Sequence, residues 1–278
     1  MTARLQVGVR SETGRRSRNE DHVGVGTAPI GWYGIVSDGV GGHVDGARAS
    51  QHVVRCLSGL LDGLRPEADF EQHRLMRAVL ATHALLQREQ PDADDARLRM
   101  NATVVALCIS ADGRRGLWAN VGDSRLYRIR SRRVEQLTID DTLVQQLVDG
   151  GMLSPEQART HPLRHQLSAA MGIAEEIEPH VAVLPCDVQD GDAFLLCTDG
   201  WWQAIDGEML CATLADAASP QAWLDAMHGR IDAAGQPNQD NYSAIAVWAG
   251  VPARLPLSSD DTLPRLQIAW PAAVLPSA

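Results

Sequence analysis

The chain has 278 residues, of which 45% are hydrophobic, and this is enough for a sizeable core in one large or two small domains. Its formal net charge of -10 argues against nucleic acid as a partner, because binding to a phosphate backbone needs a basic face. The sequence contains arginine but no lysine, which excludes phosphate-loop nucleotide-binding proteins, protein kinases and Schiff-base enzymes, since each depends on a lysine.

Cysteine usage and hydropathy give the expected compartment. The five cysteines are odd in number and show no C-x-x-C spacing, so neither a disulfide framework nor a zinc site is indicated. No run approaches the roughly 18 to 20 apolar residues that span a bilayer, and residues 1–9 do not have the pattern of a secretion signal. We therefore expect a soluble cytoplasmic protein that does not associate with membranes.

Hydrophobic periodicity predicts strands and helices in a mixed order. Alternating apolar residues predict half-buried strands, and apolar residues at helical spacing predict two amphipathic helices between residues 46 and 90. The strand positions are Leu5, Val7 and Val9, then Val105, Leu107 and Ile109, then Leu117, Ala119 and Val121. Two successive helices among these strands do not form a regular strand–helix alternation. They favour an α+β fold, with antiparallel sheets packed face to face and helices on the outside.

Short acidic blocks lie at the edges of several apolar stretches. Asp38 follows the apolar residues 32–36, and Asp199 follows residues 194–197. Carboxylates delivered to a common rim by strand ends repel one another unless cations lie between them. Ligand sets made only of oxygen favour Mg²⁺ or Mn²⁺ over zinc.

The order of these blocks carries a resemblance over residues 4–249. The blocks are R-x-x-x-E-D at 16–21, D-G-x-G-G-H at 38–43, G-D-S-R at 122–125, T-D-G at 198–200 and D-N at 240–241. Together they resemble the metal-dependent serine/threonine protein phosphatases of the 2C type. The resemblance implies a four-layer α-β-β-α sandwich, with two central antiparallel sheets and a dinuclear metal centre at one end.

The resemblance also implies a domain plan. Residues 1–250 would form the catalytic domain, with a mobile flap at about 141–170 beside the active site. Beyond it, residues 251–278 contain five prolines and little periodicity, which is typical of a tail rather than a domain.

By motif position, four residues are implied as ligands of two Mn²⁺ or Mg²⁺ ions. Asp38 would bridge both ions, Asp199 and Asp240 would complete the first, and the carbonyl oxygen of Gly39 would bind the second. Two such ions can share one water, lower its pKa and present hydroxide to phosphorus. The implied reaction is hydrolysis of phosphoserine or phosphothreonine without a phosphoenzyme.

Three further residues complete the implied active site. Glu20 and Asp21 would hold the second ion directly or through its waters. Arg16 would bind the phosphate, because a guanidinium contacts two phosphate oxygens and stays charged at every working pH. The alternative for Arg16 is a solvated surface arginine in a basic run.

Two residues keep two interpretations each. Asp123 is either a turn residue that starts a hairpin or, with Asp199, a ligand of a third and weaker ion. His43 is either a general acid for the leaving group or a structural histidine in a glycine-rich turn.

The implied partners are phosphorylated proteins that are substrates of a serine/threonine kinase. Two alternatives remain open. A regulatory module could keep this fold and bind phosphoproteins without catalysis. A cysteine-dependent phosphatase would use Cys108 and Arg114, which satisfy the C-x5-R spacing, although Asp112-Gly113 between them reads as a tight turn.

Overall fold

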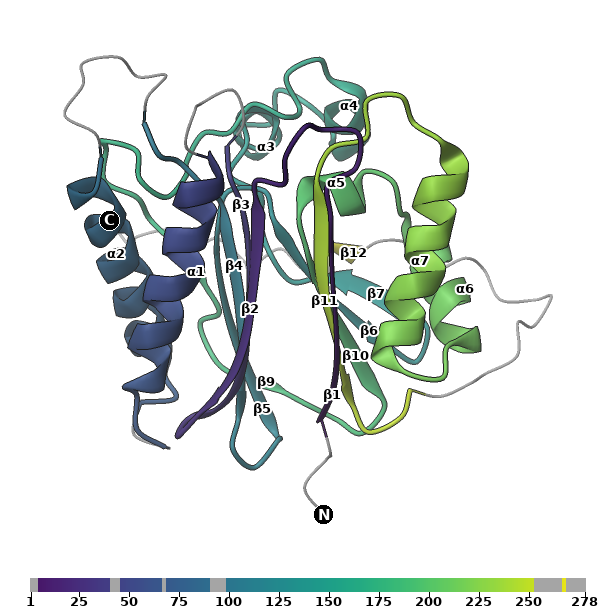
Figure 1. The fold of residues 1–278 in the computed structure, drawn as a ribbon, viewed down its shortest axis with the longest axis horizontal. Coiled ribbons are helices and arrows are strands. Elements are labelled where there is room, and N and C mark those ends of the chain that lie inside the picture. Colours follow the sequence, from purple (N-terminus) through teal and green to yellow (C-terminus); the bar gives the residue numbers. More distant parts are fainter. Residues whose placement is uncertain (1–4, 41–45, 67–68, 91–98, 253–266, 269–278) are drawn as a thin grey trace.

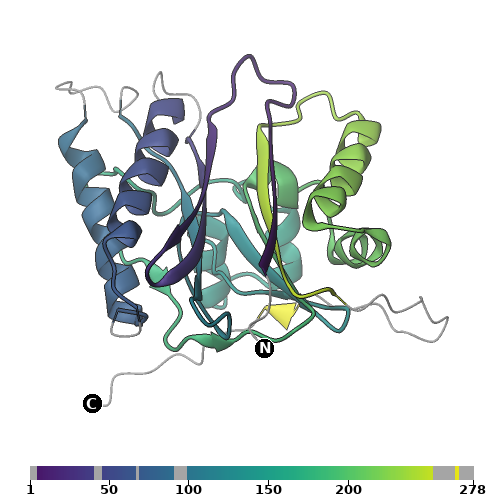
Figure 2. The ribbon, with the colours of Figure 1, turned by 60° about the horizontal axis from the view of Figure 1, so that its bottom comes forward.

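The computed structural model of the chain describes residues 5–40, 46–66, 69–90, 99–252 and 267–268 (Figure 1). Two sheets face each other in the middle of the molecule, and helices cover the outer face of each sheet (Figures 1 and 2). This is the four-layer arrangement of two antiparallel sheets and outer helices that the sequence predicted.

The first sheet has the strand order β2-β3-β4-β5-β8, with the short β9 paired to β5. Neighbouring strands in it are antiparallel. Its strands are β2 (Asp21–Ala28), β3 (Gly31–Asp38), β4 (Val104–Ser110), β5 (Arg115–Val121), β8 (His180–Val181) and β9 (Cys186–Asp187).

The second sheet has the order β1-β11-β10-β6-β7-β12. It is antiparallel except at one edge, where β12 runs parallel to β7. Its strands are β1 (Leu5–Glu12), β6 (Arg125–Arg130), β7 (Arg133–Gln136), β10 (Asp192–Cys197), β11 (Tyr242–Ala249) and β12 (Gln267–Ile268). The chain therefore passes from one sheet to the other between β5 and β6.

Helices flank both sheets. The predicted pair between residues 46 and 90 is α1 (Gly46–Asp62) and α2 (Gln72–Arg88), which cover the first sheet (Figure 1). The second sheet is covered by α5 (Asp199–Trp202), α6 (Gly207–Asp216) and α7 (Pro220–Ala234). No helix in the described ranges has the length and apolar character needed to cross a bilayer.

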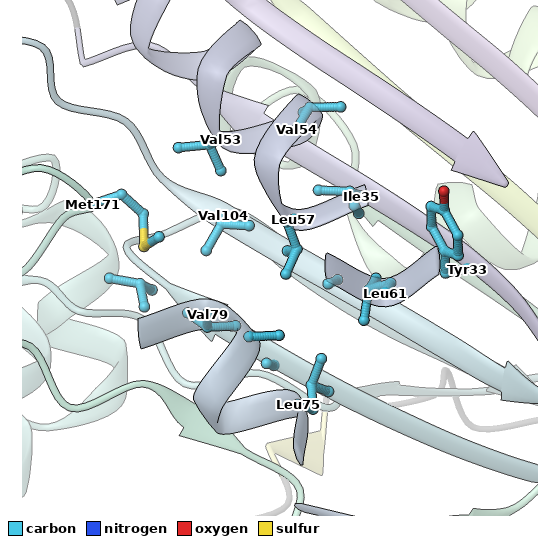
Figure 3. Packing of buried hydrophobic residues seen from close by; sticks show 14 of the residues in the cluster. Tyr33, Ile35, Val53, Val54, Leu57, Leu61, Leu75, Val79, Val104 and Met171 are labelled. Carbon is cyan, nitrogen blue, oxygen red and sulfur yellow. The ribbon is translucent and has the colours of Figure 1, made fainter. Parts of the chain in front are cut away.

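Helix α1 shows how the sequence pattern builds the core. Its fully buried residues Ala49, Val53 and Leu57 recur every four residues, so they form one stripe that faces the sheet. Figure 3 shows Val53 and Leu57 packing with Ile35 of β3 and Val104 of β4. Burial of this stripe removes apolar surface from water and fixes α1 against the first sheet.

Two strands differ in burial from the sequence prediction. Strand β4 is buried along its whole length, because Val105 and Leu107 face the second sheet while Val104 and Ala106 face the helices. In β1, Val7 is 36% exposed because the strand lies at the edge of its sheet. Burial on both faces erases the contrast that alternation would otherwise show.

The predicted insertion at residues 141–170 contains α3 (Leu143–Asp149) and α4 (Pro155–Thr160). Thr142 caps α3 by accepting a hydrogen bond from the amide of Gln145, and Ser154 forms a capping box with Gln157. That this segment is a mobile flap stays a prediction. The division at residue 250 also stays a prediction, since residues 253–266 and 269–278 lie outside the described residues.

Leu57→Ala should lower the free energy of unfolding by about 2–5 kcal/mol, because it leaves a cavity between α1 and the first sheet. The control is Leu80→Ala on α2, where the side chain is 36% exposed and the expected loss is about 0.5 kcal/mol. Urea denaturation of the two variants beside the parent protein measures both values. Equal losses would contradict the packing described for α1.

Candidate active site and metal centre

A cleft with a volume of about 540 Å³ opens at the end of both sheets, beside the loop that joins β1 to β2. This is the upper end of the sheets in Figure 1. Most of the site residues predicted from the sequence line it. The predicted residues on its wall are Arg16, Glu20, Asp38, Gly39, Asp123, Asp199 and Asp240.

The ends of strands deliver the carboxylates to this cleft. Asp21 begins β2 and Asp38 ends β3, and the antiparallel register pairs the two residues directly. Asp123 lies in the turn between β5 and β6, where the chain changes sheet. Asp199 follows β10, and Asp240 precedes β11. Segments up to 219 residues apart thus meet at one edge because their strands end there.

Asp21 lies behind the cleft wall and is only 4% exposed. Its Oδ2 accepts a hydrogen bond of 2.9 Å from the hydroxyl of Thr198, whereas its buried Oδ1 has no partner among the described residues. Burial raises the pKa of this carboxyl to about 7, and the charge of Asp199 adds to the shift. A buried oxygen without a partner is costly, so a cation beside it would be favourable.

The pKa values of three other carboxyl groups in the cleft are raised as well. Burial raises the pKa of Asp38 well above its ordinary value, with further contributions from the charges of Asp21, Asp199, Asp123 and Asp240. Burial and then Asp199 raise the pKa of Asp123, and burial and then Asp240 raise the pKa of Asp199 to about 6. Each carboxyl resists ionisation first because it is buried and then because its neighbours carry the same charge.

Two arginines at the rim pair with two of the acids. Arg16 Nη2 lies 2.7 Å from Asp240 Oδ2, and Arg18 Nε donates to Glu20 Oε1 at 2.6 Å. Arg16 is largely exposed, and its side chain lines the cleft. The guanidinium expected to bind phosphate therefore lies directly beside a predicted metal ligand.

Gly39 lies where the backbone is crowded. Its amide donates to the carbonyl oxygen of Glu20 at 3.1 Å, and a Cβ at this position would stand 2.3 Å from the carbonyl oxygen of Gly46. Only glycine fits at position 39, because a side chain there would collide with the backbone at the start of α1. The close approach keeps the β3 end, the start of α1 and the start of β2 in one rigid corner of the cleft.

Asn241 joins the loops around the cleft, a role that the D-N motif did not reveal. Its Oδ1 accepts from the amide of Glu20 at 2.8 Å, and its Nδ2 donates to the carbonyl oxygens of Thr13 and Arg18 at 2.8 and 2.9 Å. The side chain is buried. Asn241 thus fixes the loop that carries Arg16 and Glu20 to the beginning of β11.

Two threonine hydroxyls hold the acids in place, a role that the sequence did not indicate. Thr198 belongs to the T-D-G motif, whereas Thr103 belongs to none of the motifs. Thr103 Oγ1 accepts from the amide of Asp38 at 3.0 Å and bonds Ser124 Oγ at 2.7 Å. Thr198 Oγ1 donates to Asp21 and accepts from the amide of Ser243 at 3.0 Å. The Thr103 hydroxyl thus ties the end of β3 to the β5–β6 turn, and the Thr198 hydroxyl ties β2 of the first sheet to β11 of the second.

The donor set fits hard divalent cations. It consists of carboxylate and carbonyl oxygens, and the buried Oδ1 atoms of Asp21 and Asp199 have no partner in the described part of the chain. As the side chains stand, no three acidic, histidine or cysteine residues among those described converge closely enough to hold an ion. Asp240 and Glu20 are turned toward Arg16 and Arg18, so side-chain rotation is needed to complete a ligand shell.

The alternative site at Cys108 lacks the geometry for catalysis. Cys108 lies inside β4, is 2% exposed, and has a pKa raised to about 12 by burial. Gly113 donates to the carbonyl oxygen of Ser110 in a tight turn, and Arg114 is exposed at that turn. The Cys108 thiol packs among the apolar residues of the core beside the first sheet. The C-x5-R spacing is therefore coincidental.

His43, the candidate general acid, lies outside the described residues, so both of its interpretations stay predictions.

Comparison with known proteins identifies the family. The profile described as protein phosphatase 2C matches residues 10–241. The chain belongs to the protein phosphatase 2C family. This confirms the resemblance found in the motifs.

Two curated relatives of this phosphatase-family chain are bacterial. It is 34% identical over 218 residues to the serine/threonine protein phosphatase PstP of Mycobacterium tuberculosis, with 77% of this chain and 40% of PstP covered. It is 30% identical over 210 residues to protein phosphatase PhpP of Streptococcus pneumoniae, with 73% of this chain and 81% of PhpP covered. The match therefore spans less than half the length of PstP.

Solved structures of the family share the fold. The crystal structure of Mycobacterium tuberculosis PstP/Ppp has a TM-score of 0.76 at 30% identity, covering 88% of this chain and 99% of that one. The PstP catalytic domain in complex with two manganese ions has a TM-score of 0.73 at 28% identity, covering 88% and 98%. The family is metal-dependent, and the α+β sandwich expected for it is confirmed.

Burial and repulsion of the carboxylates should make the thermal stability of the protein depend on pH once EDTA has removed divalent ions. The folded state holds the Asp21 proton up to about pH 7, whereas an unperturbed Asp releases it near 3.8. The folded state thus binds more protons between these values, so its melting temperature should fall as the pH rises through that window. Calorimetry from pH 4.5 to pH 8 measures this fall.

Asp38→Asn removes one of the mutually repelling charges and should flatten that fall. Asp112→Asn is the matched control, because hydrogen bonds from Ser110 and Arg114 lower the pKa of this exposed carboxyl, and it stays ionised throughout the window. The melting temperature of Asp112→Asn should vary with pH in parallel with that of the parent protein.

Addition of Mn²⁺ should raise the melting temperature of the parent protein more at pH 8 than at pH 5, since protons compete with the metal at low pH.

Proposed function

We propose that this protein hydrolyses phosphoserine and phosphothreonine in phosphorylated proteins, with Mn²⁺ or Mg²⁺ as cofactor. The observation that carries the proposal is the cluster of Asp21, Asp38, Asp123 and Asp199, whose pKa values are all raised, at a cleft with Arg16 on its rim. Buried like charges of this kind cluster at functional sites. Membership of the phosphatase 2C family and relatives named serine/threonine phosphatases support it.

The proposed ligands are those implied by motif position, and their place at or behind the cleft supports them. Asp38 is central, because its carboxyl interacts with those of Asp21, Asp199, Asp123 and Asp240. It would be shared by two ions, with Asp199 and Asp240 on one side. When bound, divalent ions would act as Lewis acids and lower the pKa of a water that serves as nucleophile.

The second ion would lie on the other side of Asp38. The carbonyl oxygen of Gly39 is its proposed ligand, with Glu20 and Asp21 holding it directly or through water. Gly46 leaves room for the Glu20 side chain, since a Cβ there would stand 2.7 Å from Glu20 Oε2. Asp123 with Asp199 is the proposed site of a weaker third ion.

Arg16 would bind the phosphate oxygens of the substrate. In the structure its guanidinium is the counter-charge of Asp240. A cation on Asp240 would take over that neutralising role, and the guanidinium could then turn to an anion in the same cleft. Its planar donors match two phosphate oxygens and can stabilise the charge of the transition state.

The proposed substrates are proteins phosphorylated by a serine/threonine kinase, and the proposed compartment is the cytoplasm. The open cleft between the β1–β2 loop and the insertion at 141–170 admits a side chain from a protein surface. We also propose that residues 1–250 form the catalytic unit, with the insertion as its flap. Nucleic acid and membranes are not proposed as partners, since the charge of -10 opposes binding to both anionic surfaces.

Asp38→Asn should reduce Mn²⁺-dependent hydrolysis of a phosphothreonine peptide by at least about 10³-fold, because an amide cannot supply the shared negative charge. Calorimetry should show weaker Mn²⁺ binding, while circular dichroism stays that of a folded protein. Cys108→Ser is the control and should keep most activity. A parent protein that binds phosphopeptide but hydrolyses none with Mn²⁺ or Mg²⁺ would be a regulatory module instead.

Arg16→Ala should raise the KM for a phosphopeptide by about tenfold or more, because a charge-assisted contact with phosphate is worth roughly 1.5–3 kcal/mol. Affinity for Mn²⁺ should not fall, since the variant removes a competitor for Asp240. Arg15→Ala is the matched control, because Arg15 is the neighbouring exposed arginine and does not line the cleft. Identical kinetics of the two variants would make Arg16 a surface charge.

A further inference from the structure

Helix α5 carries a proposed metal ligand at one end and a tryptophan at the other. Asp199 is its first residue and Trp202 its last. Trp202 Nε1 donates a hydrogen bond of 2.9 Å to the main-chain carbonyl oxygen of Asp123. The helix that presents Asp199 is therefore tied directly to the turn that presents Asp123.

The ring of Trp202 is held in place from its face. The guanidinium carbon of Arg125 lies 3.5 Å from the ring centroid, a cation–π contact. Arg125 is itself fixed, because its Nε and Nη2 donate to the carboxylate of Asp140 at 3.0 and 2.6 Å and its Nη1 donates to the Tyr127 hydroxyl at 3.0 Å. Gln136 Nε2 donates to Asp140 at 3.2 Å. The tryptophan thus has little freedom to turn.

The turn that carries Asp123 is held on its other side as well. Gly122 donates its amide to Asp141 Oδ2 at 2.9 Å and accepts from the amide of Asp141 at 3.0 Å. Ser124 bonds Thr103 at 2.7 Å. With its neighbours fixed, Asp123 is joined to the α5 side of the cleft, in the part of the chain that the structure describes, by the bond from Trp202.

We propose that Trp202 is a positioning residue that sets the separation of Asp123 and Asp199 and thereby the affinity of the weaker third ion. The inference rests on the proposed function only in that Asp123 and Asp199 are taken as ligands of that ion. Trp202 lies at the far end of α5 and does not line the cleft, so it would act through the two aspartates and not by contact with substrate. Arg125 and Asp140 act one step further out by fixing the ring.

Trp202→Phe is the sharpest test, because it keeps an aromatic face for Arg125 and removes the N–H donor. Loss of one hydrogen bond should weaken the weaker phase of Mn²⁺ binding by about three- to tenfold. The tight phase should change less, because Asp38 and Asp240 also hold the tight ion that Asp199 binds. Electron paramagnetic resonance of free Mn²⁺ and calorimetry measure binding without any need for catalysis. Asp123→Asn gives the isotherm expected when the weaker site is lost.

Trp118→Phe is the matched control. Trp118 is also half-buried, and its Nε1 donates to a main-chain carbonyl oxygen, that of Leu137, at 3.0 Å. The Trp118→Phe variant should bind Mn²⁺ as the parent protein does, although its melting temperature should fall by about as much as that of Trp202→Phe. Tyr127→Phe removes the hydroxyl that accepts from Arg125 Nη1 and changes no charge near Asp123. It should shift the weaker phase in the same direction, which keeps the proposal testable if Trp202→Phe does not fold.

The kinetic readout should separate positioning from damage to the fold. In Trp202→Phe, the Mn²⁺ concentration that gives half-maximal hydrolysis should rise by the same factor as the dissociation constant, and saturating Mn²⁺ should restore kcat. A parent isotherm without a weaker phase, an unchanged isotherm in Trp202→Phe, or an equal shift in Trp118→Phe would each overturn the proposal. Absence of hydrolysis by the parent would refute the proposed function alone, since the binding comparison needs no turnover.

Discussion

Repulsion among buried carboxylates is the constraint on which the rest of this structure depends. Asp21, Asp38, Asp123 and Asp199 are held close together at the junction of two sheets, and burial raises the pKa of each. Left to itself, such a cluster would spread apart or bind protons. The surrounding framework must therefore be rigid enough to hold the charges together, and the proposed cations would neutralise them.

The framework achieves this by attaching each acid to an element that cannot move alone. Asp21 and Asp38 are neighbours in the β2–β3 ladder, so the two sheet faces that bury these strands also fix the pair. Asn241 binds the β1–β2 loop to β11, and Thr198 connects Asp21 with β11 through Ser243. The hydrophobic layers supply the free energy that holds this arrangement against its own charge.

Local pattern and motif order predicted much of this from the sequence, and long-range contacts explain what they missed. Helix α1 was predictable because its apolar stripe has a single period, whereas full burial removed the alternation from β4. The aspartates were found because each follows or precedes a strand. The pairing of Arg16 with Asp240 joins residues 224 positions apart, and the bond from Trp202 to Asp123 spans 79, so no local pattern encodes either.

Under the proposed function, the ion pair between Arg16 and Asp240 would link metal binding to substrate binding in a definite order. One guanidinium cannot neutralise Asp240 and grip a phosphate with the same donors. While Asp240 lacks a cation, release of Arg16 would leave an uncompensated carboxylate beside Asp199, whose pKa the charge of Asp240 already raises. A cation on Asp240 would remove that penalty, so the proposed site would bind the metal first and the phosphate second.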